Sequence, residues 1–333
     1  KLLTSMLGEL NSSHLNFRSQ GDEEKTFFKM QTMQTGIVFA GDDPFKVERI
    51  VNHSPADKKN IGLQPGDILV AVNGRAIDPA KNRDAYFTAA SADAELTLAF
   101  QRGGRPLEVK LHPETTARMK DRLYDEWIAA NQKRVDELGA KKIAYVHMKD
   151  MGDEELQQFL KEMTGEWYRR DALILDLRFN PGGYLITSVE VMSEFIDEGV
   201  VLIEQYGDGT RDTYTALGNG KATDIPIVVL INEGSASASE IVAGSLQDYG
   251  RAKLVGMQSF GKGSVQTLNL LSNDQGAARV TIARWLTPNE RLIQDVGLTP
   301  DYIVEMTDDD YTNDRDPQLD KAVEVLLGLI AQK

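Results

Sequence analysis

Two runs of apolar residues constrain the fold of this 333-residue chain more than any other feature. The segments ALILDLRF (172–179) and IPIVVLIN (225–232) have the length of a strand and are apolar almost throughout. A strand exposed on one face alternates apolar and polar residues, whereas a continuously apolar strand is covered on both faces. A third strand is expected at IAYVHM (143–148). We therefore predict an α/β layer structure in which helices alternate with these strands.

Helical periodicity marks the segments that alternate with the strands. One helix is indicated by apolar residues at helical spacing, namely Leu156, Phe159, Leu160, Met163 and Trp167. Residues 184–195 and 237–248 predict two more, and the charged segment 114–138 predicts a connecting helix. Residues 2–10 have the same spacing before turn-forming residues end the pattern, so a short N-terminal helix is expected there.

A different pattern, with short strands and tight turns, begins near residue 35. Asn73-Gly74 separates two strand-like segments, and both residue types tolerate the positive φ of a type I′ hairpin turn. ELTLAF (95–100) and PLEVKLH (106–112) alternate apolar and polar residues around a glycine pair. These features predict a β-rich module that ends near residue 113.

The length of the chain exceeds the size at which a single hydrophobic core usually stops growing. We therefore predict three parts: an N-terminal helical segment of the core at 1–34, the β-rich domain at 35–113, and an α/β core at 114–333. Because the sequence begins with Lys1 rather than Met, we also expect a preceding N-terminal segment in the full-length protein.

The composition excludes several classes of function. The 37 basic and 51 acidic residues give a net charge of −14, which repels nucleic acid backbones and anionic lipid surfaces. No apolar run approaches the ~20 residues of a membrane span, so none is expected in this chain. The absence of cysteine excludes disulfides and thiolate catalysis. His53, His112 and His147 lack metal-ligand spacing, and we predict neither a metal site nor a cofactor.

A serine-rich segment, INEGSASASE (231–240), leaves a buried strand and enters a predicted helix. Small side chains allow a substrate backbone to approach closely, and N–H groups at a helix N-terminus can hold an oxyanion. A nucleophile would suit this position. However, Ser235, Ser237 and Ser239 could merely cap the helix, which is the commoner role of serine at such a turn.

A lysine between two glycines follows 25 residues after Ser237, in SFGKGSVQ (259–266). A serine nucleophile needs a base, and lysine serves when burial lowers its pKa from about 10.4 toward about 7 to 8. Taken alone, such a lysine is more often part of a solvated turn. Only the combination of Ser237 and Lys262 indicates catalysis.

The two segments resemble those of the C-terminal processing (tail-specific) proteases, which have a GSASASE nucleophile segment and a downstream FGKGxxQ motif. The resemblance extends over essentially the whole chain, through DLRFNPGG (176–183), RWLTPN (284–289), GLTPD (297–301) and DPQLDKAVEVLL (316–327). It implies a ClpP/crotonase-like core and a serine endopeptidase, a hydrolase that uses a Ser/Lys dyad.

The resemblance also implies a role for individual residues. Ser237 would be the nucleophile, Lys262 the general base, and Gln266 the residue that orients the lysine amine. The oxyanion hole would consist of backbone N–H groups of Gly182, Gly183 and Ala238.

Residues 35–113 resemble the PDZ domain of these proteases, with SPADKKNIGLQPGDILVAVNG (54–74) as its longest matching segment. A PDZ groove binds an extended peptide as an added strand and caps its terminal carboxylate with backbone N–H groups. The carboxylate-binding loop would consist of Gly36, Ile37, Val38 and Phe39. The implied partners are unfolded or flexible protein substrates with free C-termini.

One segment resembles a different group. GELNSSH (8–14) is similar to a segment of tricorn-type proteases, in which the corresponding histidine is the base of a Ser-His arrangement. Those enzymes have a carboxylate where this chain has Gln294, and they lack the FGKG lysine. We favour Lys262 as base and keep two alternatives, namely a tricorn-like Ser-His peptidase that uses His14 and a non-catalytic PDZ scaffold. Family likeness implies a periplasmic or cell-envelope location in a bacterium, and homo-oligomer formation is compatible with it.

Overall fold

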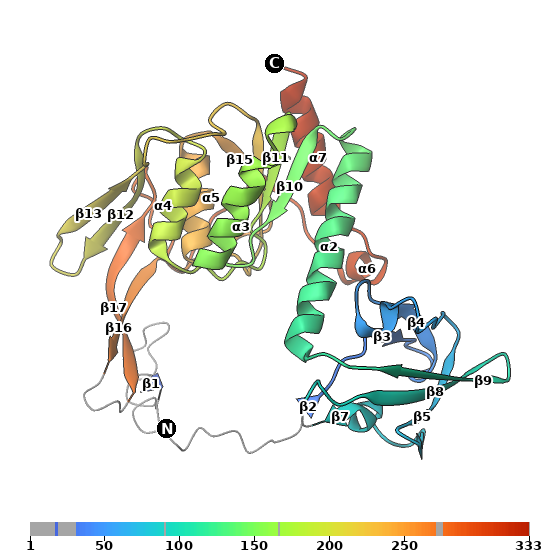
Figure 1. Ribbon diagram of the computed structural model, residues 1–333. Coiled ribbons are helices and arrows are strands. Elements are labelled where there is room, and N and C mark those ends of the chain that lie inside the picture. The colour runs from blue at the N-terminus through green and yellow to red at the C-terminus, as the bar shows by residue number, and fades with distance from the viewer. Residues whose placement is uncertain (1–16, 19–30, 90, 166, 271–275, 333) are drawn as a thin grey trace. The chain divides into compact units, whose positions relative to one another are not determined.

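The computed structural model describes residues 17–18, 31–89, 91–165, 167–270 and 276–332 (Figure 1). The chain divides into two compact units, and the division falls between Ala130 and Asn131, inside helix α2 (Thr116–Leu138). The smaller unit contains the described residues from 31 to 130. The larger unit contains residues 17–18 and the described residues from 131 onward. The domain limits at 34 and 113 stay a prediction, and the helix expected at 2–10 lies outside the described residues.

A five-stranded parallel sheet forms the centre of the larger unit. Its strands, in hydrogen-bonded order, are β10 (Ile143–His147), β11 (Ala172–Asp176), β14 (Ile227–Ile231), β15 (Ala252–Gly256) and β18 (Tyr302–Ile303). Every residue of β11 and β14 is buried, as the two apolar runs predicted. The predicted α/β class is therefore confirmed.

Helices cover both faces of this sheet. They are α3 (Asp153–Thr164), α4 (Leu185–Ser193), α5 (Ala238–Asp248) and α7 (Pro317–Ile330). A short helix without buried residues, α6 (Asp308–Thr312), precedes α7. Alternate residues of a strand face opposite sides, so Leu173 and Leu175 join the core that contains Phe159 of α3, while Ile174 faces away from it. Helix α7 packs against β11, β14 and β15. No helix among the described residues has both the length and the apolar character needed to cross a membrane.

A second, antiparallel sheet stands beside the helices (Figure 1). Its strands are β1 (Phe17–Arg18), β12 (Val200–Tyr206), β13 (Arg211–Thr215), β16 (Ser264–Leu270) and β17 (Ala277–Leu286). The chain enters β16 directly after the lysine of the FGKG segment, so this sheet carries one wall of the candidate site.

The smaller unit is built from short antiparallel strands around its own core. The strands are β2 (Gln31–Thr32), β3 (Ile37–Phe39), β4 (Val47–Ile50), β5 (Ile68–Val72), β6 (Arg75–Ala76), β7 (Thr88–Ala89), β8 (Leu96–Arg102) and β9 (Arg105–Leu111), with 3-10 turns η2 (Pro55–Asp57) and η3 (Arg83–Phe87). Asn73 and Gly74 join β5 to β6 with φ angles of 51° and 74°, as the predicted type I′ turn requires. Leu98 and Phe100 are fully buried at the centre of the core.

Candidate active site

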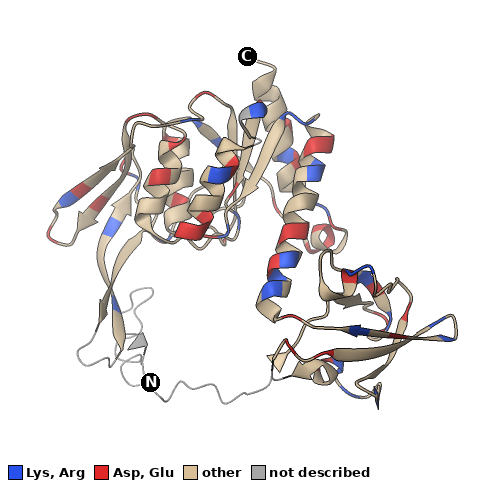
Figure 2. Cartoon of the chain, in the orientation of Figure 1, with Lys and Arg blue, Asp and Glu red and all other residues tan. Residues whose placement is uncertain are grey.

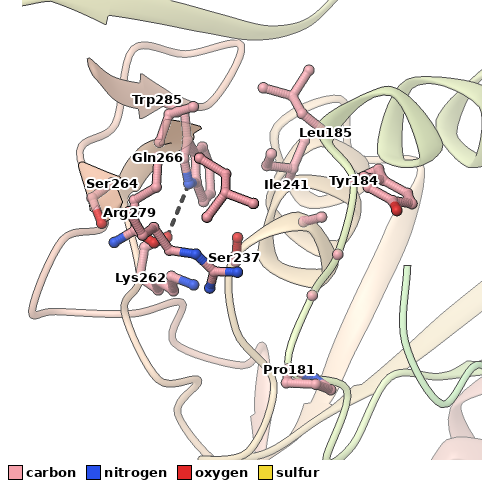
Figure 3. A pocket seen from close by; sticks show the side chains of 15 residues that line it. Pro181, Tyr184, Leu185, Ser237, Ile241, Lys262, Ser264, Gln266, Arg279 and Trp285 are labelled. Carbon is pink, nitrogen blue, oxygen red and sulfur yellow. Dashed lines mark hydrogen bonds between the residues drawn. The ribbon is translucent and has the colours of Figure 1, made fainter. Parts of the chain in front are cut away.

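The predicted catalytic residues line one cavity of about 570 Å³ in the larger unit, here called the Ser237 pocket (Figure 3). Ser237 enters it from the N-terminus of α5, Lys262 from the segment before β16, and Gln266 from β16 itself. Segments far apart in sequence thus supply a hydroxyl, an amine and an amide to the same space.

Ser237 occupies a strained turn. It is the N-cap of α5, directly after the segment that leaves buried strand β14, and its φ is 59°. A non-glycine residue in this conformation costs of order 1 to 3 kcal/mol, and such strain is concentrated at functional sites. This conformation directs the half-buried side chain into the Ser237 pocket, as Figure 3 shows for its hydroxyl.

The hydrogen bonds of the three neighbouring serines distinguish Ser237 from Ser235 and Ser239. The Ser235 hydroxyl donates to the Leu177 carbonyl at 2.7 Å, and the Ser239 hydroxyl donates to the Asn180 carbonyl at 2.9 Å. Both serines are 0% exposed. Their hydroxyls hold the α5 turn against the loop after β11, whereas Ser237 presents its hydroxyl to the pocket. Ser237 itself holds the N-cap position, where its backbone N–H donates to Glu240, and the outer two serines brace the loops instead.

Lys262 is half-buried, and both of its backbone groups are fixed. Its N–H donates to a Glu240 carboxylate oxygen at 2.9 Å, and its carbonyl accepts from the Trp285 indole N–H at 2.9 Å. Burial lowers the pKa of the Lys262 amine, the positive charge of Arg279 lowers it further, and Glu240 opposes them. A lowered pKa increases the neutral fraction of the amine near neutral pH, which is the form that a general base needs.

Close packing explains one of the glycines beside the lysine. Gly261 has a φ of 86°, and a Cβ there would lie 2.7 Å from the backbone nitrogen of Gly297. The glycine therefore lets the loop that contains Lys262 pack onto the 296–297 turn.

Glu240 is a site residue that the sequence analysis missed. Its carboxylate is 0% exposed and accepts four hydrogen bonds, from the N–H groups of Ser237, Gly261 and Lys262 and from the Ser259 hydroxyl, at 2.6 to 2.9 Å. Burial raises the pKa of Glu240, and these hydrogen bonds oppose the rise. One side chain thus links the turn that contains Ser237 to the loop that contains Lys262.

We expect Glu240→Gln to lower kcat by about tenfold to a hundredfold with a smaller change in KM. An amide has one acceptor oxygen instead of two, so at least one buried donor loses its partner, at about 1 to 3 kcal/mol each. Steady-state kinetics and thermal unfolding would measure the two effects. Exposed Glu233, in the same segment, provides the control Glu233→Gln. Equal kcat in the two variants would contradict the positioning role.

The loop after β11 places the predicted oxyanion groups beside Ser237. Gly182 approaches the nucleophile turn so closely that a Cβ would lie 2.7 Å from the Ser237 Cβ. However, its N–H donates to the Asn180 side-chain oxygen at 2.9 Å, so it is not directed at substrate. Among the described residues the Gly183 N–H has no such bond, and Ala238, the first residue of α5, has no acceptor within its helix. Gly183 and Ala238 therefore fit the predicted role better than Gly182 does.

A buried ion pair lies at the start of the loop that follows β11. Arg178 is 5% exposed and contacts the fully buried Asp176 at 2.6 Å, and it also reaches Asp316 at the N-terminus of α7. The Tyr145 hydroxyl donates to Asp176 at 2.9 Å. Burial opposes the charge of Asp176, but Arg178 outweighs it, so the pKa of this carboxyl stays below its usual range. The network anchors the chain just before the oxyanion glycines.

Two residues that bear on the choice of base remain, Gln294 and His14. Gln294, which stands where tricorn-type enzymes have a carboxylate, accepts a hydrogen bond from the Gly263 N–H at 2.9 Å and so braces the lysine loop. His14, the rival base, lies outside the described residues.

The predicted carboxylate loop in the smaller unit is a loop only at Gly36, because Ile37–Phe39 form the edge strand β3. Gly36 has a φ of 83°, and among the described residues β3 pairs with β4 alone. A small cavity of about 40 Å³ lies between β3 and η3, with Ile37 and Phe39 on one side and Phe87 on the other. A peptide added to the free edge of β3 would place alternate side chains here.

Comparison with known proteins agrees with this geometry. The model of peptidase family S41 matches residues 142–304, and a PDZ domain model matches residues 46–102. A carboxy-terminal-processing protease of Bartonella bacilliformis is 34% identical over 270 residues, which cover 78% of this chain and 58% of that protein. A carboxyl-terminal-processing protease of Synechocystis is 43% identical over 164 residues, or 48% of this chain and 38% of that protein. The chain thus spans about half the length of these relatives.

Solved structures share the fold. A photosystem II D1 C-terminal processing protease superposes with a TM-score of 0.52 at 24% identity, over 91% of this chain and 81% of that chain. A tricorn protease superposes with a TM-score of 0.69 at 22% identity, over 97% of this chain and 31% of that chain.

The parallel core, the Ser/Lys pocket and the separate β-rich unit define a peptidase of family S41 joined to a PDZ domain. Within that family the chain belongs with the carboxyl-terminal-processing proteases, the group that the sequence motifs indicated.

Proposed function

We propose that this chain is a serine endopeptidase in which Ser237 attacks the scissile carbonyl and Lys262 is the general base. The observation that carries the proposal is that the Ser237 hydroxyl and the Lys262 amine face one pocket, while Glu240 accepts hydrogen bonds from both of their backbone N–H groups. Glu240 thereby holds the backbone of both residues, which supports a shared reaction of their side chains.

The geometry supports a two-step reaction. Neutral Lys262 takes the proton of the Ser237 hydroxyl as the oxygen bonds to the carbonyl carbon, and the protonated amine then gives that proton to the leaving amine. The N–H groups of Gly183 and Ala238 stabilise the oxyanion. Water, deprotonated by Lys262, then cleaves the acyl-serine ester and releases the new C-terminus.

We propose further that the PDZ domain selects substrates by their C-termini. The free edge of β3 would receive the tail as an added strand, and the loop around Gly36 would bind the terminal carboxylate through backbone N–H groups. Flexible proteins with free C-termini are therefore the proposed substrates.

We expect Ser237→Ala to abolish both cleavage of an unstructured protein and labelling by a fluorophosphonate probe. The probe reacts with an activated serine and requires no peptide recognition, so it reports the nucleophile alone. Ser239→Ala provides the control, because its hydroxyl braces a loop, and this variant should still be labelled at Ser237 despite a stability loss of about 1 kcal/mol.

Three results would count against the proposal. Labelling that survives in Ser237→Ala would place the nucleophile elsewhere. Activity that is lost in His14→Ala and kept in Lys262→Ala would assign the base to His14, as in the tricorn-like alternative. A wild-type chain that binds tails but is neither labelled nor active would be the PDZ scaffold.

A further inference from the structure

A second cation shares the pocket with Lys262. Arg279 lies on β17, opposite Leu268 of β16, and its side chain lines the Ser237 pocket. Figure 3 shows its guanidinium group directed into the space that the Ser237 hydroxyl and the Lys262 amine also face. An arginine stays protonated and cannot take a proton from serine, so the mechanism above gives Arg279 no step.

No ion pair of the described residues compensates the charge of Arg279. The side chains that line the pocket include two cations and no carboxylate. Strand β17 carries two arginines, and neither β16 nor β17 has an acidic residue (Figure 2), although the whole chain has a net charge of −14. None of the ion pairs among the described residues includes Arg279. As far as the described part of the chain extends, the site therefore offers a positive charge that no ion pair shares, in an otherwise acidic protein.

The surroundings of Arg279 favour a particular ligand. A guanidinium group binds a carboxylate through two parallel hydrogen bonds, a geometry that lysine cannot supply. The lining of the pocket also includes apolar side chains, among them exposed Tyr184 and Leu268 and buried Ile241. A few polar groups in such a pocket fix the orientation of a ligand. Two neighbouring cations also repel each other, and an anion bound between them would relieve this repulsion.

We propose that Arg279 is a specificity-determining residue that binds a carboxylate of the peptide substrate next to the scissile bond. The inference rests on the proposed peptidase function and names the substrate class for it. The carboxylate is supplied either by a Glu or Asp side chain or by the free C-terminus of a tail that is cut close to its end. Both groups present the same chemistry to the guanidinium.

Two peptide series would test the proposal on the full chain. In the first, one glutamate is moved along an amidated scaffold, position by position around the cleaved bond, and compared with glutamine. In the second, a scaffold without acidic side chains is shortened so that its free C-terminus approaches the bond, and acid is compared with amide. The variants are Arg279→Met, Arg279→Lys and the control Arg284→Met, an exposed arginine of β17 that does not line the Ser237 pocket.

We expect the wild type to prefer the carboxylate in at least one position by about tenfold to a hundredfold in kcat/KM. Arg279→Met should remove this ratio, Arg279→Lys should keep part of it, and Arg284→Met should keep all of it. The series that shows the preference identifies the source of the carboxylate. Ratios are compared on the high-pH plateau of each variant, because the charge of Arg279 also lowers the pKa of Lys262.

The inference is overturned if no position prefers a carboxylate or if the ratio survives in Arg279→Met. It is likewise overturned if Arg279→Met shifts only the pH profile, since Arg279 would then act on Lys262 alone. Fluorophosphonate labelling separates this failure from that of the peptidase proposal. A labelled wild type that cleaves peptides without any charge preference rejects only the role of Arg279, whereas an unlabelled, inactive one rejects the peptidase itself.

Discussion

Replacing Lys262 with methionine is expected to lower kcat for peptide cleavage by about four to six orders of magnitude while the fold is retained. Methionine keeps most of the length of the side chain but cannot accept a proton, and removing one member of a catalytic unit costs nearly as much as removing the whole unit. Steady-state kinetics and circular dichroism would check both parts. Lys253→Met is the control, since its amine pairs with Asp301 outside the pocket. Equal activity in both variants would remove Lys262 from the mechanism.

The pH profile adds a second readout for Lys262. Only the neutral amine is a base, so the wild-type rate should rise with pH through a pKa that burial and Arg279 hold below the usual value for lysine. Stability should change in the same direction. The unfolded chain binds the proton more tightly, so the cost of burying the ammonium group is fully present below the folded pKa and disappears as pH rises toward the unfolded value. At neutral pH, Lys262→Met should therefore unfold at a higher temperature than the wild type.

The second large effect concerns stability. Arg178→Met is expected to destabilise the protein by about 3 to 5 kcal/mol, because it leaves the fully buried Asp176 without its counter-ion. Urea unfolding would measure the loss. Arg211→Met, which breaks an exposed pair with Glu290, should cost at most about 1 kcal/mol.

Two further measurements make the Arg178 prediction specific. Without Arg178, burial should raise the pKa of Asp176, so the defect should shrink as pH falls and the carboxyl becomes protonated. Adding Asp176→Asn to Arg178→Met should likewise restore part of the stability. A defect that is independent of pH and unchanged in the double variant would indicate lost packing instead.

The sequence predicted the parallel core well because each central strand is recognisable by itself. The runs at 172–179 and 225–232 are apolar whatever they pair with, and the hairpin at Asn73-Gly74 depends on two adjacent residues. The antiparallel sheet could not be predicted in the same way. Strand β16 is half-exposed and β17 has two arginines, so their pattern is weak until the pairing is known. Periplasmic or envelope location stays a prediction.

The sequence predicted only part of the site. Some of its residues are recognisable by themselves, whereas others act through contacts that only the fold creates. Motif resemblance selected Ser237 and Lys262, whose chemistry is evident from residue type. Glu240 looked like an ordinary residue of a helical first turn, and nothing local indicates that its carboxylate reaches Lys262, 22 residues further along the chain. Likewise, two adjacent glycines have the same sequence signal, and only the fold shows that Asn180 engages the first of their N–H groups.

The four hydrogen bonds of Glu240 also affect how such enzymes can decay in evolution. A descendant that lost this carboxylate would retain the serine, the lysine and the small residues around them, because none of those side chains would have changed. However, no single carboxylate would then bind the backbone N–H groups of both the serine and the lysine. A genome survey that scores only the Ser/Lys pair would count this descendant as fully active, so the acidic residue three positions after the serine should be scored together with that pair.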